Sequence, residues 1–357
     1  MSPAAAPRTR SDLVRLLESR GTPFDALEEG PRWAIVTPSL AARILGAGVD
    51  EENAFWVSPS PPPAAGAWFN AGGQRTWLAP EGGPAGIFCG MDLAAWTVPP
   101  ALDPGRFQPA AGPHAWRAEL EVRPADGSRH RIGLVRSMTL EDHPGIPGGM
   151  LIRFRHELSN RGDSVLNRRI SLWGLVQLPC EDEGGAVFVG LSRAGAMPAS
   201  YFGEMPAPVH GDEGSTAWFG LRGGSRFKAG VSAADFSGTM GFVRRPRAAF
   251  RLGELLVTAM SFRVEPAGTY LEHAPSLWPA GSSSGDAAQV YQDPGTGPLA
   301  FCEIEAHSPA PRLAPGEAVA EVMLISVARV NERDLSEVLT RGLGLARGSV
   351  PAGILPP

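Results

Sequence analysis

An arginine, a tryptophan and a glutamate are spaced among glycines between Gly72 and Gly83, in the sequence GGQRTWLAPEGG. Arg75 and Trp77 are two residues apart, so their side chains share a face if this segment is a strand. A guanidinium donates hydrogen bonds in a planar fork and an indole stacks on flat surfaces, a pair that suits a hydroxyl-rich ring. The segment predicts part of a sugar-binding cleft, with Glu81 as either a ligand contact or a turn cap. The alternative is a surface arginine beside a core tryptophan.

A second candidate site lies in the segment Phe301–His307, FCEIEAH. Side chains alternate along a strand, so Phe301, Glu303, Glu305 and His307 would share one face. Carboxylates can take up and return protons, which makes Glu303 and Glu305 the catalytic candidates and His307 a candidate ligand contact. A solvated strand face would give the same alternation.

Aromatic and amide side chains that suit a sugar occur in further segments. In Ser171–Pro179, Trp173 and Gln177 would share a strand face. Tryptophan stacks on sugar rings and a glutamine amide bonds hydroxyl groups. We also predict Trp278 as a second stacking platform, and Tyr291 and Gln292 as lining residues. A place in the core is the alternative for Trp278.

Composition and charge argue against several classes of function. The 357 residues include 32 Lys and Arg against 37 Asp and Glu, and no basic block, so no nucleic-acid partner is expected. No apolar run is long enough to span a membrane, and the N-terminus lacks the apolar segment of a secretory signal, so we expect a cytoplasmic protein. The seven histidines and three cysteines show no metal-ligand spacing. We therefore expect neither a metal nor a cofactor, and the oligomeric state stays open.

The expected secondary structure is mostly strand. Short helices are predicted over 11–20, with Ser11 as cap and Gly21 as stop, and over 332–339. Between them, period-two alternation cut by glycine- and proline-rich turns predicts fifteen or more short strands. The predicted strands are 32–38, 41–46, 67–70, 75–78, 86–89, 114–124, 131–140, 150–158, 167–178, 186–191, 217–222, 226–232, 239–244, 255–265, 287–291, 299–306 and 318–329.

Many short strands, few helices and a uniform composition predict an all-β fold, a large antiparallel sandwich or barrel. No internal repeat and no linker long enough to separate domains is visible. We expect an N-terminal helix and lead-in over 1–29, a single β domain over 30–330, and a C-terminal helix and tail over 331–357.

Several segments, taken in order, resemble the galactose mutarotase-like superfamily, the fold of aldose 1-epimerases. The resemblance covers roughly residues 30–330 and implies a divergent branch with a β-supersandwich and a carbohydrate-sized groove across one sheet. The segments that carry it are ARILG at 42–46, the stretch 72–83, LSNRG at 158–162, ISLWGLVQLP at 170–179, FCEIEAHSP at 301–309 and LAPGE at 313–317.

The resemblance also implies roles for single residues. Glu305 matches the catalytic glutamate of the family, because Pro309 follows at similar spacing. Epimerases of the family carry a histidine on the strand after the Asn-x-Gly turn, and 171–179 has none. Other histidines are either substitutes for that acid or structural residues: His156, His210, His273 and His307.

The missing histidine favours a carbohydrate-binding protein that holds a saccharide in the groove without turnover. One alternative is a sugar epimerase or isomerase, in which Glu305 is the general base and Arg75 orients the ring. The other is a non-catalytic protein-interaction module, because a fold does not determine a function.

Overall fold

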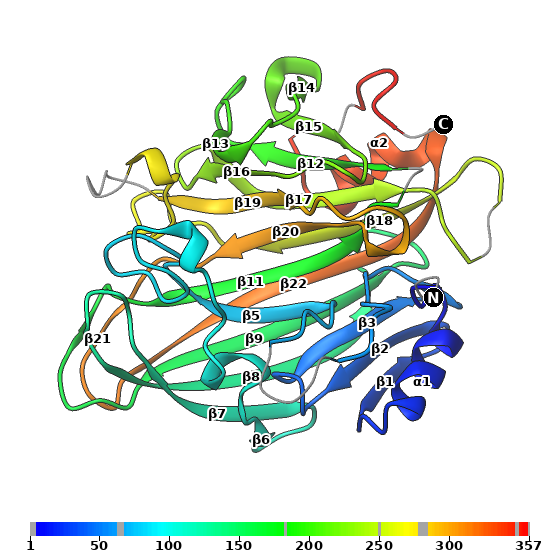
Figure 1. The fold of residues 1–357 in the computed structure, drawn as a ribbon. Helices are drawn as coiled ribbons and strands as arrows, with labels where there is room; N and C mark the ends of the chain where they lie inside the picture. Colours follow the sequence, from blue (N-terminus) through cyan, green and yellow to red (C-terminus); the bar gives the residue numbers. More distant parts are fainter. Residues whose placement is uncertain are drawn as a thin grey trace.

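Two large antiparallel sheets packed face to face make up most of the protein (Figure 1). The computed structural model describes residues 5–62, 68–181, 184–248, 251–277, 285–346 and 350–355. The predicted all-β fold, a large antiparallel β-supersandwich, is confirmed.

The first sheet carries the candidate site residues near its middle. Within the described residues it has ten strands, in the spatial order β1-β2-β3-β5-β11-β20-β19-β16-β13, with β4 paired to β3. Its strands are β1 (Asp25–Glu29), β2 (Arg32–Thr37), β3 (Arg43–Val49), β4 (Glu52–Asn53), β5 (Gln74–Ala79), β11 (Ser171–Pro179), β13 (Ala199–Gly203), β16 (Phe227–Ser232), β19 (Asp286–Gln292) and β20 (Phe301–His307).

The second sheet backs the first one. Its order over the described chain is β14-β15-β12-β17-β18-β22-β9-β8-β7-β6. The strands are β6 (Gln108–Pro109), β7 (Ala115–Val122), β8 (His130–Asp142), β9 (Met150–Asn160), β12 (Gly185–Leu191), β14 (Val209–His210), β15 (Thr216–Leu221), β17 (Phe236–Arg244), β18 (Glu254–Phe262) and β22 (Ala318–Asn331). A small separate pair joins β10 (Leu166–Asn167) to β21 (Arg312–Leu313).

Short helices flank the sheets, as predicted. The N-terminal helix α1 (Arg10–Ser19) is capped by Thr9, two residues before the predicted cap Ser11, in a capping box with Asp12. The C-terminal helix α2 (Leu335–Glu337) is shorter than predicted and continues an irregular helical stretch that ends at Gly342. No helix in the described part of the chain is long and apolar enough to cross a membrane.

The main core lies between the sheets, and strand alternation decides which side chains enter it. On β20, Cys302, Ile304 and Ala306 pack in this core together with Phe154 of β9 and Ile325 of β22. The side chains between them on β20 point to the opposite face of the first sheet. That outer face holds the candidate site.

Two of the predicted strands are wrong. Residues 68–70 and Gly86–Cys89 form loops, and residue 67 lies outside the described residues. Trp68 and Phe88 nevertheless pack against Trp77 of β5, in a cluster on the outer face of the first sheet. These apolar loop residues pack on the sheet instead of forming a strand in it. A period-two pattern does not distinguish the two cases.

Candidate functional site

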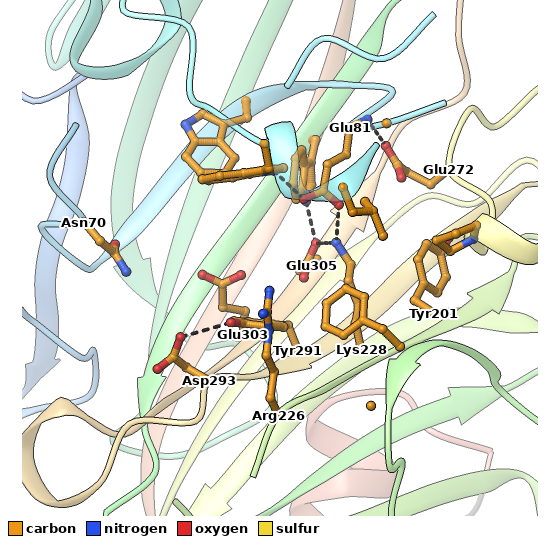
Figure 2. Close-up of a pocket in the computed structure, with 18 of the residues that line it drawn as sticks. Asn70, Glu81, Tyr201, Arg226, Lys228, Glu272, Tyr291, Asp293, Glu303 and Glu305 are labelled. Carbon is orange, nitrogen blue, oxygen red and sulfur yellow. Dashed lines mark hydrogen bonds and ion pairs between the residues drawn. The ribbon is translucent and has the colours of Figure 1, made fainter. Parts of the chain in front are cut away.

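A cavity of about 720 Å³ opens on the outer face of the first sheet (Figure 2). Its floor comes from six neighbouring strands, β5, β11, β20, β19, β16 and β13, and loops form its walls. Its volume is in the range of small-molecule sites in proteins. Its charged lining residues are Arg75, Glu81, Arg226, Lys228, Glu272, Asp293, Glu303 and Glu305.

The register of three central strands brings most predicted site residues together. Leu175 of β11 lies opposite Arg75 of β5 on one side and Glu305 of β20 on the other. Two pairs further along, on the same face of the sheet, Trp173 lies opposite Trp77. Arg75, Trp77, Trp173, Glu303 and Glu305 all line the cavity.

Glu303 is held in place by an ion pair and an amide. Its Oε1 accepts a hydrogen bond from Arg75 Nη2 at 3.2 Å and another from Gln177 Nε2 at 2.5 Å. Gln177 does not line the cavity, so its contact with the site is this support of Glu303. Burial raises the pKa of Glu303, and the Arg75 guanidinium opposes that rise.

Glu305 is fully buried at the bottom of the site. Its Oε2 accepts a hydrogen bond from Trp173 Nε1 at 2.8 Å and lies 3.3 Å from Lys228 Nζ. Its Oε1 has no hydrogen-bond partner among the described residues. Burial raises the pKa of Glu305 to about 8, a rise that Lys228 opposes and Glu303 increases. Burial therefore favours the protonated form of this carboxyl, and Lys228 favours the ionised form.

Lys228 is the central cation of the site and was not predicted. Its Nζ lies 2.8 Å from Glu81 Oε2 and 4.9 Å from the centre of the Trp173 ring (Figure 2). Burial alone would lower the pKa of Lys228, but Glu305 and Glu81 raise it above its usual value. A sequence signal does exist, because Lys228 is the single lysine among 32 Lys and Arg residues. It also alternates with the core residues Phe227 and Ala229.

Glu81 connects the floor of the cavity to its wall. Its carboxylate accepts a hydrogen bond from Trp96 Nε1 at 2.9 Å and pairs with Lys228. Its backbone N–H donates to Glu272 Oε1 at 2.6 Å. Burial and the nearby Glu81 charge raise the pKa of Glu272 to about 7. Glu272 is another lining residue that the sequence did not reveal.

The aromatic side chains of the site differ in how much of each ring is free. The Arg75 guanidinium lies 4.0 Å from the centre of the Trp77 ring. Trp173 is stacked with His307 at 5.5 Å and is also contacted by Lys228. Trp68 and Trp96 are only half-buried and line the cavity wall. These two indoles are the better placed for stacking on a ligand.

A buried aspartate anchors the tryptophan wall. Asp103 Oδ1 pairs with Arg43 Nη2 at 2.6 Å, and its Oδ2 accepts hydrogen bonds from Nε1 of Trp68 and Trp77, each at 3.2 Å. Burial opposes ionisation, but Arg43 and Arg75 lower the pKa of Asp103 below its usual value. Asp103 therefore stays a carboxylate and fixes both indoles.

The histidines lie outside the cavity. His307 is buried beneath Trp173, and its Nε2 lies 3.0 Å from Gln289 Oε1. His156 contacts Thr76 Oγ1 through Nδ1 at 2.9 Å. Burial holds the pKa of both imidazoles well below the usual range, so neither is a proton donor at neutral pH. Trp278 lies outside the described residues.

Metal ligands are not grouped in the part of the chain that the structure describes. It contains no set of three or more His, Cys, Asp or Glu side chains placed to hold an ion. The three cysteines are buried and unpaired. The lining carboxyls are instead engaged with Arg75, Lys228 and backbone or indole N–H groups.

The shifted pKa of Glu305 predicts a pH-dependent stability. Between about pH 4.5 and 8 the folded protein holds a proton on Glu305 that the unfolded chain has lost, so the free energy of unfolding falls as pH rises. Glu305→Gln removes this contribution. From pH 5 to pH 8 we expect wild type to lose about 2–4 kcal/mol more than the variant in urea denaturation. Glu272 and Asp286 titrate in the same direction in both proteins. If the free energy of unfolding changed equally with pH in wild type and variant, the raised pKa of Glu305 would be contradicted.

Comparison with known proteins places the chain in a family. A model of a family of unknown function, DUF6786, matches residues 26–350. The chain belongs to DUF6786. No functionally curated protein matches it.

The DUF6786 chain is also similar to several solved structures. One is a proposed aldose 1-epimerase from Escherichia coli K12, at 12% identity and a TM-score of 0.49, covering 87% of this chain and 100% of that one. Another is a galactose mutarotase-like protein from Lactobacillus casei, at 12% identity and a TM-score of 0.48, covering 86% and 100%.

Proposed function

We propose that this protein binds a saccharide in the cavity on the outer face of the first sheet. One observation carries the proposal: buried carboxyl and ammonium groups lie on the cavity floor, beside the half-buried indoles of Trp68 and Trp96 on its wall. A sugar presents hydroxyl groups at its edge and an apolar face of C–H groups. The hydroxyl groups suit the polar floor, and the face of C–H groups suits an indole.

The polar floor can both donate to and accept from hydroxyl groups. Glu305 Oε1 has no protein partner in the described structure, and both donors to Glu303 go to its Oε1. Lys228 has three N–H donors, two of which are directed at Glu81 and Glu305. A ligand hydroxyl can donate a hydrogen bond to a free carboxyl oxygen and accept one from the remaining N–H of Lys228. An apolar ligand would leave these groups unsatisfied.

Binding fits the floor better than general-base catalysis by Glu305. A general base must be ionised, and burial raises the pKa of Glu305 to about 8. Burial disfavours that ionised form, and no histidine lines the cavity in the described part of the chain, so we propose saccharide binding as the function rather than epimerisation through Glu305. A protein partner would need a broad surface, whereas the polar groups of this site lie at the bottom of a cavity.

A thermal-shift screen tests the proposal. The panel contains neutral monosaccharides, amino sugars, uronic acids, sugar phosphates and short oligosaccharides. A ligand present at 100 times its Kd adds about 2.7 kcal/mol to the free energy of unfolding, which a melting curve resolves. A stabilising sugar supports the proposal, and a flat response across the panel at millimolar concentrations would overturn it.

Trp96→Ala is expected to weaken binding of the sugar found in that screen at least fivefold. The variant removes an indole that lines the cavity, and stacking of this kind contributes about 1 kcal/mol or more. Phe69→Ala is the matched control, because Phe69 is a half-buried aromatic outside the cavity lining. Titration calorimetry on both variants, after a melting-curve check of folding, gives the comparison. Equal affinities would remove Trp96 from the site.

A further inference from the structure

Carboxyl groups outnumber cations in the lining of the cavity. The acidic residues are Glu81, Glu272, Asp293, Glu303 and Glu305, and the basic ones are Arg75, Arg226 and Lys228. Charges inside a cavity with low-dielectric walls act more strongly on a ligand than charges in open water. The excess of carboxyl groups over cations therefore affects which ligand charge the cavity favours.

The two buried cations are already neutralised by protein groups. Arg75 pairs with Glu303 and lies over Trp77. Lys228 pairs with both Glu81 and Glu305 (Figure 2). The third cation, Arg226, is exposed to solvent and lies over the Phe202 ring at 4.9 Å. No buried cation is left over for an anionic ligand in the described lining.

Two carboxyl oxygens are left for the ligand. Glu305 Oε1 is buried and has no partner in the described part of the chain, since Trp173 and Lys228 both contact Oε2. The Arg75 and Gln177 contacts of Glu303 are made with Oε1, which leaves Oε2 for the cavity. Glu303 and Glu305 are two residues apart on β20 and line the same cavity. The free acceptors thus lie side by side on one strand face.

The crowded carboxyls hold protons that a ligand cation would displace. Lys228, Glu303 and Glu81 are the charged groups with the largest effect on Glu305, and Arg75 pairs with the neighbouring Glu303. Burial and, after it, the neighbouring carboxylates raise the pKa of Glu305 to about 8 and that of Glu272 to about 7. A positive group beside them would favour the ionised forms, whereas an anionic group would be repelled.

We propose that the saccharide is an amino sugar whose protonated amine binds between Glu303 Oε2 and Glu305 Oε1. The inference rests on the proposed saccharide function and adds the chemical class of the ligand. An ammonium has three donors and no acceptor, which matches a pair of free carboxyl oxygens. Hydrogen bonds between charged partners are roughly twice as strong as neutral ones, so the amine should bind more tightly than a hydroxyl at the same position.

Titration calorimetry on the full chain with matched sugars tests the inference. The probes are glucose, glucosamine and N-acetylglucosamine, the corresponding galactose series, and glucuronate, all at pH 6.5, where the amine is protonated. We expect an amino sugar to bind at least tenfold more tightly than its neutral and N-acetylated counterparts, and glucuronate to bind most weakly. Titrations in two buffers of different ionisation enthalpy should show proton release with the amino sugar alone.

The outcomes separate this inference from the function on which it rests. Tight binding of a neutral sugar or of glucuronate, with no preference for the amine, would overturn the amino-sugar inference and leave saccharide binding standing. Absence of binding by every probe would overturn the amino-sugar inference, and the wider thermal-shift panel decides whether saccharide binding stands.

A pair of variants locates the amine. Glu305→Gln should reduce the affinity ratio of amino to neutral sugar at least fivefold. Glu321→Gln is the control, because it changes a half-buried carboxyl on β22 of the other sheet and should leave the ratio unchanged. An unchanged ratio in a folded Glu305→Gln variant would exclude the proposed position of the amine.

Discussion

Asp103→Ala is expected to lower the free energy of unfolding by about 3–5 kcal/mol, because it leaves Arg43 as a buried cation without its carboxylate. Arg43 is fully buried, and its guanidinium otherwise contacts only backbone oxygens in the described structure. The indole N–H groups of Trp68 and Trp77 lose their common acceptor as well. The variant should therefore change tryptophan fluorescence in addition to stability.

Urea denaturation followed by fluorescence measures the effect of Asp103→Ala. Asp163→Ala is the matched control, because its carboxylate pairs with Arg131 at 3.2 Å with a side chain that is 96% exposed. Such a surface pair contributes little, and the control should change stability by less than about 0.5 kcal/mol. A loss below about 1 kcal/mol in Asp103→Ala would mean that Arg43 finds another partner or reaches water.

Lys228→Met is expected to destabilise the protein by about 3–5 kcal/mol at pH 8 and by clearly less at pH 5. The substitution keeps an unbranched side chain that is one heavy atom shorter, but it leaves Glu81 and Glu305 without their shared cation. At pH 5, well below the raised pKa of Glu305, that carboxyl binds a proton at lower cost, so the uncompensated negative charge is smaller. At pH 8 the negative charge left without Lys228 either stays buried or is removed by taking up a proton at a pH that favours the ionised form. Either outcome costs free energy.

The pH profile distinguishes this electrostatic role of Lys228 from a packing role. Arg341→Met is the control, because Arg341 is an exposed residue whose pair with Glu337 spans one helical turn. Its effect should be within about 0.5 kcal/mol at either pH. A loss in Lys228→Met that is the same at pH 5 and pH 8 would show that the side chain matters for packing and not for charge.

Local periodicity was enough to predict the pairs of residues that share the floor. Arg75 with Trp77, and Glu303 with Glu305, are two positions apart on strands, and a strand alternates strictly between its faces. By the same rule Ile304 and Ala306 point to the opposite face of β20, and both lie in the core. Alternation also put Gln177 on the face of Trp173, and Gln177 reaches the site only as a donor to Glu303.

Contacts between distant segments could not be predicted in this way. Lys228 meets Glu81 across 147 positions of sequence, and Trp68 meets Asp103 from a different loop. His307 shares a strand face with Glu305, yet the Trp173 ring stacked on it separates it from the cavity. Whether a side chain lines the cavity or is covered by a neighbouring side chain depends on tertiary packing. A local sequence pattern does not encode that packing.

The order of strands across the floor also constrains how the protein folds. The floor runs β5, β11, β20, β19, β16 and β13, so β11 pairs on its two sides with strands that are far from it in the sequence, β5 and β20. Folds dominated by such non-local pairings form slowly, because long loops must close before the contacts stabilise them. A nascent chain has no complete site until β20 has emerged from the ribosome. A ligand that binds here can stabilise only the finished fold, and shortening the chain from either side of the floor should abolish binding together with folding.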